Sequence, residues 1–580
     1  MACTDASAQN SHIVSKQCLF VSSRLHEASA RKISAAHAIY DRSLSFIGRV
    51  RLDGREELCS TLFDSNVVSG AISDAEIFLR AYRRWGDRCL ERLRGDFCFA
   101  LWDESKQRLF CGRDHLGIRA LFYAKTGGAW IVSDSLEFVV SGRLNSDLDE
   151  YWIADFLTFG FSVDFERTVY SNVKRLPPAH FLSLCRESVK VEKYWTLQIH
   201  RPIYYRRRSD YIDHFHEVVG LAVKDRLPDC EVGISMSGGL DSPTLAAHAL
   251  RLKGDASKVI AHTRYFQSFI ADEEKRYGEL VAKRLGIRIV VRAIDEGYDP
   301  SWYCRDAHTL EPSLDTIFAE SKQVIAAEMR QQAEVWLLGE GPDNALAFEW
   351  RAYLKWLFRS MRWLYLSRAV FEYVRGKQVR EWHSTLANFM KAQAVNERQQ
   401  LSEAVPFWLN DTLVKELQLV ERVSSKRGPE HPWHPRALAS FNSSIWQSVL
   451  GRFDNSVSRT PLDWRHPYLD LRVLTFLLSV PPIPWGRRKQ LMREAMQGWL
   501  PTEILCRDKT PIPRDYVAAM VQKYGLPQIS KESPVSRFVD LARLPTVGGE
   551  RFVSRAVIRA YVLDAWLRSN AERSRVSGRA

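Results

Sequence analysis

The sequence lacks a long apolar segment, a secretory signal and a cysteine framework. No apolar run reaches the roughly 18 residues that a helix needs to cross a bilayer, so we expect no membrane span. Residues 1–12 are small and polar, without the basic and apolar stretches of a signal peptide. The ten cysteines form no C-x-x-C pair, and none stands at zinc spacing from a histidine. We therefore expect a cytoplasmic protein with reduced thiols.

Acidic residues are too few to balance the basic ones. The chain has 82 Lys and Arg against 69 Asp and Glu, a formal net charge of +13. Such a surface can attract nucleic acid, an anionic membrane or an acidic substrate. The basic residues are dispersed, with only short runs at Arg206–Arg208 and Arg487–Lys489. We therefore do not expect a nucleic-acid partner.

The first part of the chain has the pattern of an α+β domain. A chain of 580 residues is too long for one core, and we place the first domain at residues 1–200. Residues 1–45 are weakly patterned, and the rest predicts a largely antiparallel sheet. The expected strands are Leu44–Arg51, Phe97–Trp102, Leu109–Arg113, Leu121–Ala124 and Trp130–Ser133, and the expected helices are Glu56–Phe63 and Ala75–Arg84.

After the polar connector Pro202–Ser209 the pattern changes, and we place a second domain at residues 209–580. Strands alternate with helices there, which indicates βαβ units and a parallel sheet. Beyond about residue 345 the pattern is mostly helical. The expected strands are Glu231–Met236, Lys258–Thr263, Ile287–Ala293 and Val335–Leu338, and the expected helices are Tyr211–Leu227, Thr244–Leu252, Glu273–Leu285 and Ser321–Gln332.

A glycine loop between the first strand and helix of the second domain carries the strongest signal. It consists of Ser237, Gly238, Gly239, Leu240, Asp241 and Ser242. Its glycines let the backbone approach an anion, and the following helix N-terminus offers unpaired N–H groups. It has no Gly-Lys-Ser/Thr and is not a Walker A loop. The loop resembles the PP-loop of the N-type ATP pyrophosphatases, which holds pyrophosphate; the alternative is an ordinary glycine turn.

A second loop follows the strand Val335–Leu338. It contains Gly339, Glu340, Gly341 and Asp343. Ligands of parallel sheets bind at the carboxyl ends of the strands, so Asp241 and Asp343 are expected to meet there. Two carboxylates beside ATP phosphates suit Mg²⁺. The alternative is a surface turn with solvated acidic groups.

Further segments match one family. The chain resembles the asparagine synthetase family from about residue 44 to about residue 515. This resemblance implies an Ntn, glutaminase-like α+β domain, then a PP-loop ATP pyrophosphatase domain with a parallel sheet and a helical C-terminal part. The segments are Leu93–Asp103 and Gly112–Arg119 in the first domain, and Asp272–Glu273, Arg465–Asp470, Lys489–Arg493 and Arg507–Lys509 in the second.

The glutaminase-like domain departs from the family pattern. Glutamine-using members carry Cys directly after Met1, where this sequence has Ala2. The R-G-P-D and N-G-E segments that bind glutamine are absent, and Gly48–Leu58 stands in place of the second. We therefore expect a degenerate amidotransferase domain. The residue pattern of Gly48–Leu58 is most similar to that of the lasso peptide macrolactam synthetases.

The resemblance implies an AMP-forming reaction with ATP and Mg²⁺. The loop residues Ser237, Gly238, Gly239, Leu240 and Ser242, with Gly339 and Gly341, bind the nucleotide, and Asp241 and Asp343 hold the metal. Lys509 stabilises the tetrahedral intermediate. Glu340 serves as general base, or it only orients Lys509 or a loop.

In the lasso group the substrate is a leader-processed core peptide, whose α-amine attacks an adenylated Asp or Glu side chain. The resemblance then implies a leader-binding protein and a leader protease as pathway partners. The alternatives are an ammonia-dependent enzyme like asparagine synthetase, a small-molecule lactam synthetase of the β-lactam type, and a scaffold with a relic ATP site.

Overall fold

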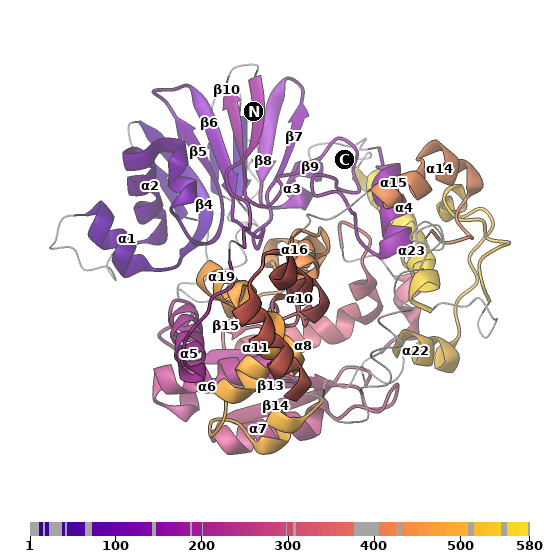
Figure 1. Ribbon diagram of the computed structural model, residues 1–580. Helices are drawn as coiled ribbons and strands as arrows, with labels where there is room; N and C mark the ends of the chain where they lie inside the picture. Colours follow the sequence, from indigo (N-terminus) through magenta and orange to yellow (C-terminus); the bar gives the residue numbers. More distant parts are fainter. Residues whose placement is uncertain are drawn as a thin grey trace.

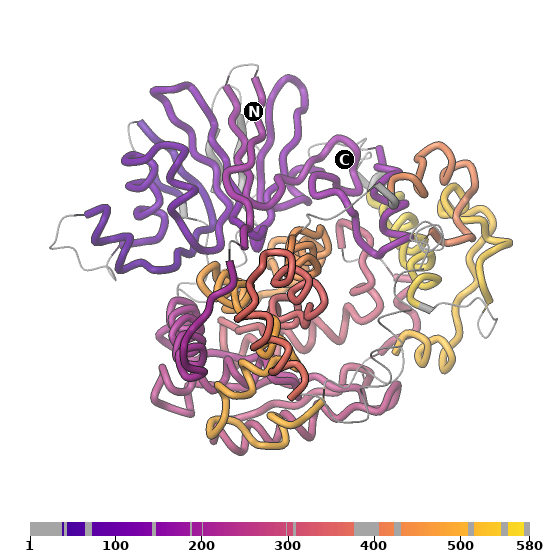
Figure 2. The backbone as a smooth tube through the Cα atoms, in the orientation of Figure 1, coloured from indigo at the N-terminus to yellow at the C-terminus, as the bar shows by residue number. Residues whose placement is uncertain are grey.

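The computed structural model describes residues 11–14, 18–22, 37–40, 43–63, 72–141, 147–185, 188–199, 201–296, 298–305, 309–375, 405–425, 431–508, 516–546 and 554–577. Within these ranges a β-rich N-terminal domain, indigo to purple in Figure 1, rests on a larger α/β domain. The tube in Figure 2 shows the yellow C-terminal segment beside the first domain. In the described parts of the chain, no helix combines the length and apolar character that crossing a membrane requires.

Two sheets build the N-terminal domain. One has the order β11-β10-β6-β5-β4-β3 and is antiparallel throughout; the other has the order β1-β2-β8-β7-β9. The five predicted strands are confirmed, and β1 to β3 lie in the weakly patterned first 45 residues. The strands are β1 Ser11–Val14, β2 Cys18–Ser22, β3 His37–Tyr40, β4 Leu44–Leu52, β5 Gly95–Asp103, β6 Arg108–Arg113, β7 Phe122–Thr126, β8 Ala129–Ser133, β9 Lys174–Arg175, β10 His180–Cys185 and β11 Ser188–Lys193.

Neighbouring side chains along each strand point to opposite faces of the sheet, and in this way they contribute to two apolar layers. On β5, Phe97 and Phe99 pack beneath the helices α1 (Arg55–Leu62) and α2 (Asp74–Trp85), whereas Ala100 packs between the two sheets. This is the period-two pattern of a strand that is buried on both faces. A helical layer over two stacked sheets confirms the expected Ntn-type domain.

The second domain is centred on a parallel sheet of five strands in the order β14-β13-β12-β15-β16. The four predicted strands are confirmed. The sequence did not reveal β16, which pairs with β15 although it follows more than a hundred residues later in the chain. The strands are β12 Val232–Ser235, β13 Val259–Tyr265, β14 Arg288–Ala293, β15 Val335–Leu337 and β16 Asp463–Arg465.

Helices cover both faces of this sheet. Ile234 and Leu337 face the side of α5, α6 and α7, while Trp336 faces the side of α8, because neighbouring strand residues point to opposite faces. These four helices are the predicted ones: α5 Arg208–Lys224, α6 Asp241–Lys253, α7 Glu274–Leu285 and α8 Ala319–Gln332.

The described remainder of the second domain is mostly helical, as predicted. Its last helix returns to the first domain, where Ile558 and Trp566 share an apolar cluster with Trp152 of α4 (Glu150–Phe159). Its helices are α9 Pro342–Ala345, α10 Trp350–Arg359, α11 Trp363–Arg375, α14 Asp411–Glu416, α15 Leu419–Ser425, α16 Pro435–Phe441, α17 Ile445–Gly451, α18 Asn455–Ser458, α19 Leu471–Ser479, α20 Gln490–Ala495, α21 Thr502–Cys506, α22 Tyr516–Tyr524 and α23 Ser554–Ser577.

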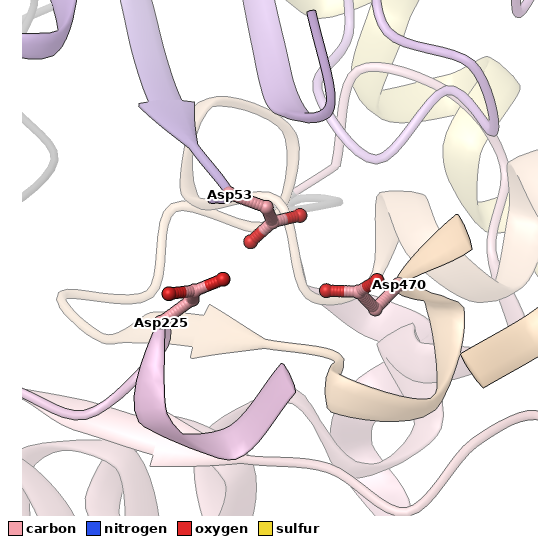
Figure 3. Close-up of side chains that lie close together, drawn as sticks. All are labelled: Asp53, Asp225 and Asp470. Carbon is pink, nitrogen blue, oxygen red and sulfur yellow. The ribbon is translucent and has the colours of Figure 1, made fainter. Parts of the chain in front are cut away.

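Buried ion pairs join the two domains. Three carboxylates, Asp53, Asp225 and Asp470, converge from different elements in Figure 3. Their charge is balanced by arginines: Arg226, which is 1% exposed, lies 3.0 Å from Asp53 and 2.8 Å from Asp470. Arg472 lies 2.6 Å from both Asp225 and Asp470. The cluster is therefore an interdomain connection in which guanidinium groups take the place that a cation would need.

Candidate active site

The glycine loop joins β12 to α6 at the carboxyl end of the sheet. A Cβ on Gly238 would lie 2.5 Å from Nη1 of Arg507 and 2.7 Å from Cβ of Tyr277, so only glycine fits there. The Oγ atom of Ser242 accepts a hydrogen bond from the N–H of Ser237 at 2.8 Å. Leu240 is buried in the core and anchors the loop. The predicted strand, glycine turn and helix are therefore all present.

The loop already binds an oxyanion of the protein itself. The N–H of Gly238 donates to Oε2 of Glu274 at 2.5 Å, and the N–H of Gly239 donates to Oγ of Ser237 at 3.3 Å. The Glu274 carboxylate stands in for a phosphate oxygen, which shows that this backbone presents its donors to an anion. Asp272 and Glu273 resemble the acidic pair of the family, but it is Glu274 that reaches the loop.

The second loop packs directly against the first. A Cβ on Gly339 would lie 3.1 Å from the N atom of Ser242, so this glycine allows the two backbones to approach. Gly341 has a φ of +129°, which glycine adopts without the strain of a side chain. It leads into α9, whose first turn carries Asp343. The structure thus brings Asp241 and Asp343 together, as the sequence predicted.

Lys489 connects these two carboxylates. Its Nζ atom lies 2.5 Å from Oδ2 of Asp241 and 2.6 Å from Oδ1 of Asp343. Two carboxylates that converge on one cation form a donor set that also suits a divalent metal. Arg488 and Lys489 have φ values of 50° and 54°, and such left-handed backbone at non-glycine residues gathers at functional sites. The sequence showed Lys489 only as part of a family motif, and its contact with the two aspartates became visible in the fold.

Glu340 lies at the exposed rim of the site. Partial burial, followed by the negative charges of Asp241 and Asp343, raises the pKa of its carboxyl group. Each cause disfavours the ionised form, so Glu340 holds its proton to a higher pH than an ordinary glutamate does. A carboxylate with a raised pKa is a stronger base than that of an ordinary glutamate and can serve as a proton acceptor.

The predicted catalytic residue Lys509 lies outside the described residues. Its neighbour Arg507 donates from Nη1 to the carbonyl oxygen of Gly238 at 2.6 Å, and its guanidinium lies 4.0 Å from the ring centroid of Tyr277. Asp508 pairs with Arg488. The described part of this segment therefore ends at the glycine loop.

The segment Gly48–Leu58, which stands in place of the glutamine-binding motif, contains an arginine that forms buried ion pairs. Arg49 is 3% exposed, and it lies 2.7 Å from both Asp134 and Asp454. The carboxylates come from the first and the second domain, respectively. A Cβ on Gly48 would lie 2.6 Å from Cβ of Phe99, so this glycine serves packing between β4 and β5. In this segment the side chains hold the two domains together.

The fold and site define an ATP-dependent carbon–nitrogen ligase with an amidotransferase-type N-terminal domain. The glutamine amidotransferase domain pattern matches residues 55–195, and the asparagine synthase pattern matches residues 214–570. The chain belongs to the asparagine synthase family.

Curated relatives agree with this assignment. The asparagine synthetase [glutamine-hydrolyzing] 3 of Bacillus subtilis (strain 168) is 23% identical over 77% of this chain and 71% of its own length. A putative asparagine synthetase [glutamine-hydrolyzing] of Mycobacterium bovis is 26% identical over 80% and 73%, respectively. The amidase chyE of Penicillium rubens is 25% identical over 74% and 71%. The chain is thus an asparagine-synthetase-like enzyme that forms amides with ATP.

Proposed function

We propose that the enzyme is a lasso peptide cyclase. It adenylates an Asp or Glu side chain of a leader-processed core peptide, and it closes an isopeptide macrolactam with the N-terminal α-amine. The observation that carries the proposal is the contrast between the two domains. The synthetase loops bring Asp241, Asp343 and Lys489 together, whereas Arg49 in the amidotransferase domain is tied up in buried ion pairs.

The first step forms the acyl-adenylate. A carboxylate oxygen of the peptide attacks the α-phosphorus of ATP, and the bond to pyrophosphate breaks. The N–H groups of Gly238 and Gly239 and the hydroxyl of Ser242 hold the departing pyrophosphate, a role for which Glu274 moves aside. Asp241 and Asp343 would hold Mg²⁺, which would neutralise charge on the phosphates when bound. Lys489 then binds phosphate oxygens in place of the two carboxylates.

The second step forms the amide bond. The α-amine attacks the acyl carbon, AMP leaves, and the nitrogen loses a proton. Glu340 accepts that proton, because its raised pKa makes its carboxylate a stronger base than that of an ordinary glutamate. Lys509, on the segment that follows Arg507, stabilises the negative charge of the tetrahedral intermediate.

The space beside the site supports a substrate larger than aspartate and ammonia. A cavity of about 390 Å³ lies between the two domains, with Trp152, Phe161 and Met329 among its apolar walls. That volume is in the range of pockets that hold drug-sized ligands. A leader-processed peptide also requires a leader-binding protein and a leader protease to act before this enzyme.

A direct test uses the purified enzyme with ATP, Mg²⁺ and synthetic peptides. The peptides carry a free α-amine and one Asp or Glu at successive positions. We expect AMP, pyrophosphate and a peptide lighter by one water, detected by mass spectrometry. ADP formation would contradict adenylation. If aspartate with ammonium gives AMP and asparagine while no peptide cyclises, the enzyme is instead an ammonia-dependent asparagine synthetase.

A further inference from the structure

The active-site end of the interdomain cavity carries an excess of positive charge. Arg264, Lys322 and Arg452 line the cavity there, together with the single carboxylate of Asp315. Glu340 interacts electrostatically with Arg264 and with Arg452, which places this group of charges next to the reacting centre. Arg264 stands near the carboxyl end of β13, in the same sheet as the two catalytic loops. This is where parallel sheets bind their ligands.

One carboxylate is shared among these three cations. Lys322 forms an ion pair with Asp315, and Nε of Arg452 lies 3.7 Å from Oδ2 of the same residue. The side chain of Arg264 forms neither a hydrogen bond nor an ion pair with the described residues, although the charges of Asp315 and Glu340 act on it from a distance. A buried guanidinium whose N–H groups have lost water without gaining hydrogen-bond acceptors is costly. An anion that enters the cavity would supply those acceptors.

We propose that Arg264, Lys322 and Arg452 bind the side-chain carboxylate that is to be adenylated. The proposal rests on the proposed function and names the group by which the enzyme recognises its peptide. The apolar walls of the cavity then accept the residues on either side of that Asp or Glu.

The chemistry of the first step requires such a site. The nucleophile is an ionised carboxylate, which must come close to the negative phosphates of ATP. Fixed cations keep the carboxylate ionised and offset its repulsion from the phosphates. The planar fork of Arg264 can orient both carboxylate oxygens, whereas Lys322 contributes a point charge.

The test measures the reversible first step alone, as exchange of radioactive pyrophosphate into ATP. The probes are N-acetyl-L-aspartate amide and N-acetyl-L-glutamate amide, which carry a side-chain carboxylate and no amine that could close a ring. N-acetyl-L-asparagine amide is the uncharged control. With wild-type enzyme we expect exchange with at least one acidic probe and none with the control.

In the variants Arg264→Gln and Lys322→Gln, the KM for the probe should rise roughly 10- to 100-fold, the scale of a hydrogen bond to a charged group. The KM for ATP should stay within about 2-fold, and Arg264→Lys should recover part of the loss. Arg459→Gln is the matched control, because Arg459 also lines the cavity but is paired with Glu137 at 2.6 Å.

Unchanged probe KM values in both variants would overturn the inference, and so would an equal loss in Arg459→Gln. Absence of exchange with either acidic probe would also overturn it. The proposed function is judged separately, by the cyclised peptide, so that the two can fail independently. C-terminally amidated peptides distinguish the side-chain carboxylate from the terminal one: if amidation abolishes exchange with peptides, the cluster binds the C-terminus and the inference is wrong.

Discussion

At the scale of single residues, the site is defined by acids that converge on one cation. Asp241 and Asp343 come from different loops, and both contact Lys489. Neither aspartate lies in the apolar core, because each follows the carboxyl end of its strand, β12 or β15. Their contribution is therefore expected in turnover and not in folding.

The variants Asp241→Asn and Asp343→Asn should lose roughly 10²-fold or more in turnover, the scale of one main electrostatic contact in a closed site. Pyrophosphate release with peptide and ATP measures this loss, and thermal unfolding should shift little. Asp255→Asn, on a surface turn, is the control. Near-wild-type turnover in both variants would remove these residues from the site.

Glu340 sets a pH dependence for amide formation. A base must be ionised, and the pKa of Glu340 is raised, so the rate should increase as pH rises through that pKa. In Glu340→Gln the rate should be low and this rise should be lost. Single-turnover cyclisation at a series of pH values measures it. A profile that is unchanged in the variant would assign Glu340 a positioning role.

Lys509 separates the two chemical steps. Lys509→Ala should keep ATP affinity within a few-fold and form almost no cyclised product, because its charge acts after amine attack. Lys509→Arg should fail as well, since a planar fork does not replace a compact ammonium. Mass spectrometry of the product beside calorimetry of ATP binding measures both effects. A comparable rate of ring closure in Lys509→Ala would show that this lysine lies outside the chemistry.

At the scale of elements, the junction of β12 and α6 depends on the shape of its loop. Gly238 lies against Arg507 and Tyr277, and its N–H is directed at an oxyanion. The segment that precedes Lys509 thus contacts the same loop to which we assign pyrophosphate binding. A change in the loop should therefore affect both substrates of the enzyme.

Gly238→Ala should raise the KM for ATP and lower turnover by roughly 10²-fold, because a displacement of about 1 Å has that effect in a positioned site. Steady-state pyrophosphate release measures it. Gly220→Ala is a matched control in α5, where a Cβ would meet only Nδ1 of His248 at 3.9 Å. That change should leave activity intact and stabilise the helix by roughly 0.5–1 kcal/mol. Equal activity in the two variants would refute the steric argument.

At the scale of the whole molecule, buried charge pairs fix the domains to each other. Burial alone would raise the pKa of Asp454 and of Asp470, but Arg49 and Arg226 hold both well below the usual range. Carboxyl groups of this kind stabilise the fold at pH values above their ordinary pKa of roughly 3.9. This stabilisation is lost as the pH falls towards the lower pKa values that the groups have in the folded protein. The enzyme should therefore lose stability steeply in acid.

Arg226→Met should cost roughly 3–5 kcal/mol at neutral pH, because it removes one buried counter-charge from both Asp53 and Asp470, which keep Arg51 and Arg472 as partners. It should also reduce the loss of stability between about pH 5 and 3, since the pKa of Asp470 is then less depressed. Urea unfolding across this pH range measures both. Arg88→Met, an exposed residue 3.7 Å from Glu91, should change stability by less than about 1 kcal/mol. Equal effects of the two substitutions would show that the interdomain pairs do not stabilise the fold.

The sequence by itself determined the two-domain order, the parallel sheet and the two loops that carry Asp241 and Asp343. Those features depend on local patterns, namely alternation, helical periodicity and glycine turns, which are readable over short windows. Only the tertiary structure decided that Lys489 joins the two aspartates, that Glu274 reaches the glycine loop and that β16 completes the sheet. It also decided that Arg49 and Arg226 connect the domains and that Arg264 lines the cavity. These contacts unite residues up to hundreds of positions apart, and a charged side chain has the same local signature whether it is solvated, paired or poised for a ligand.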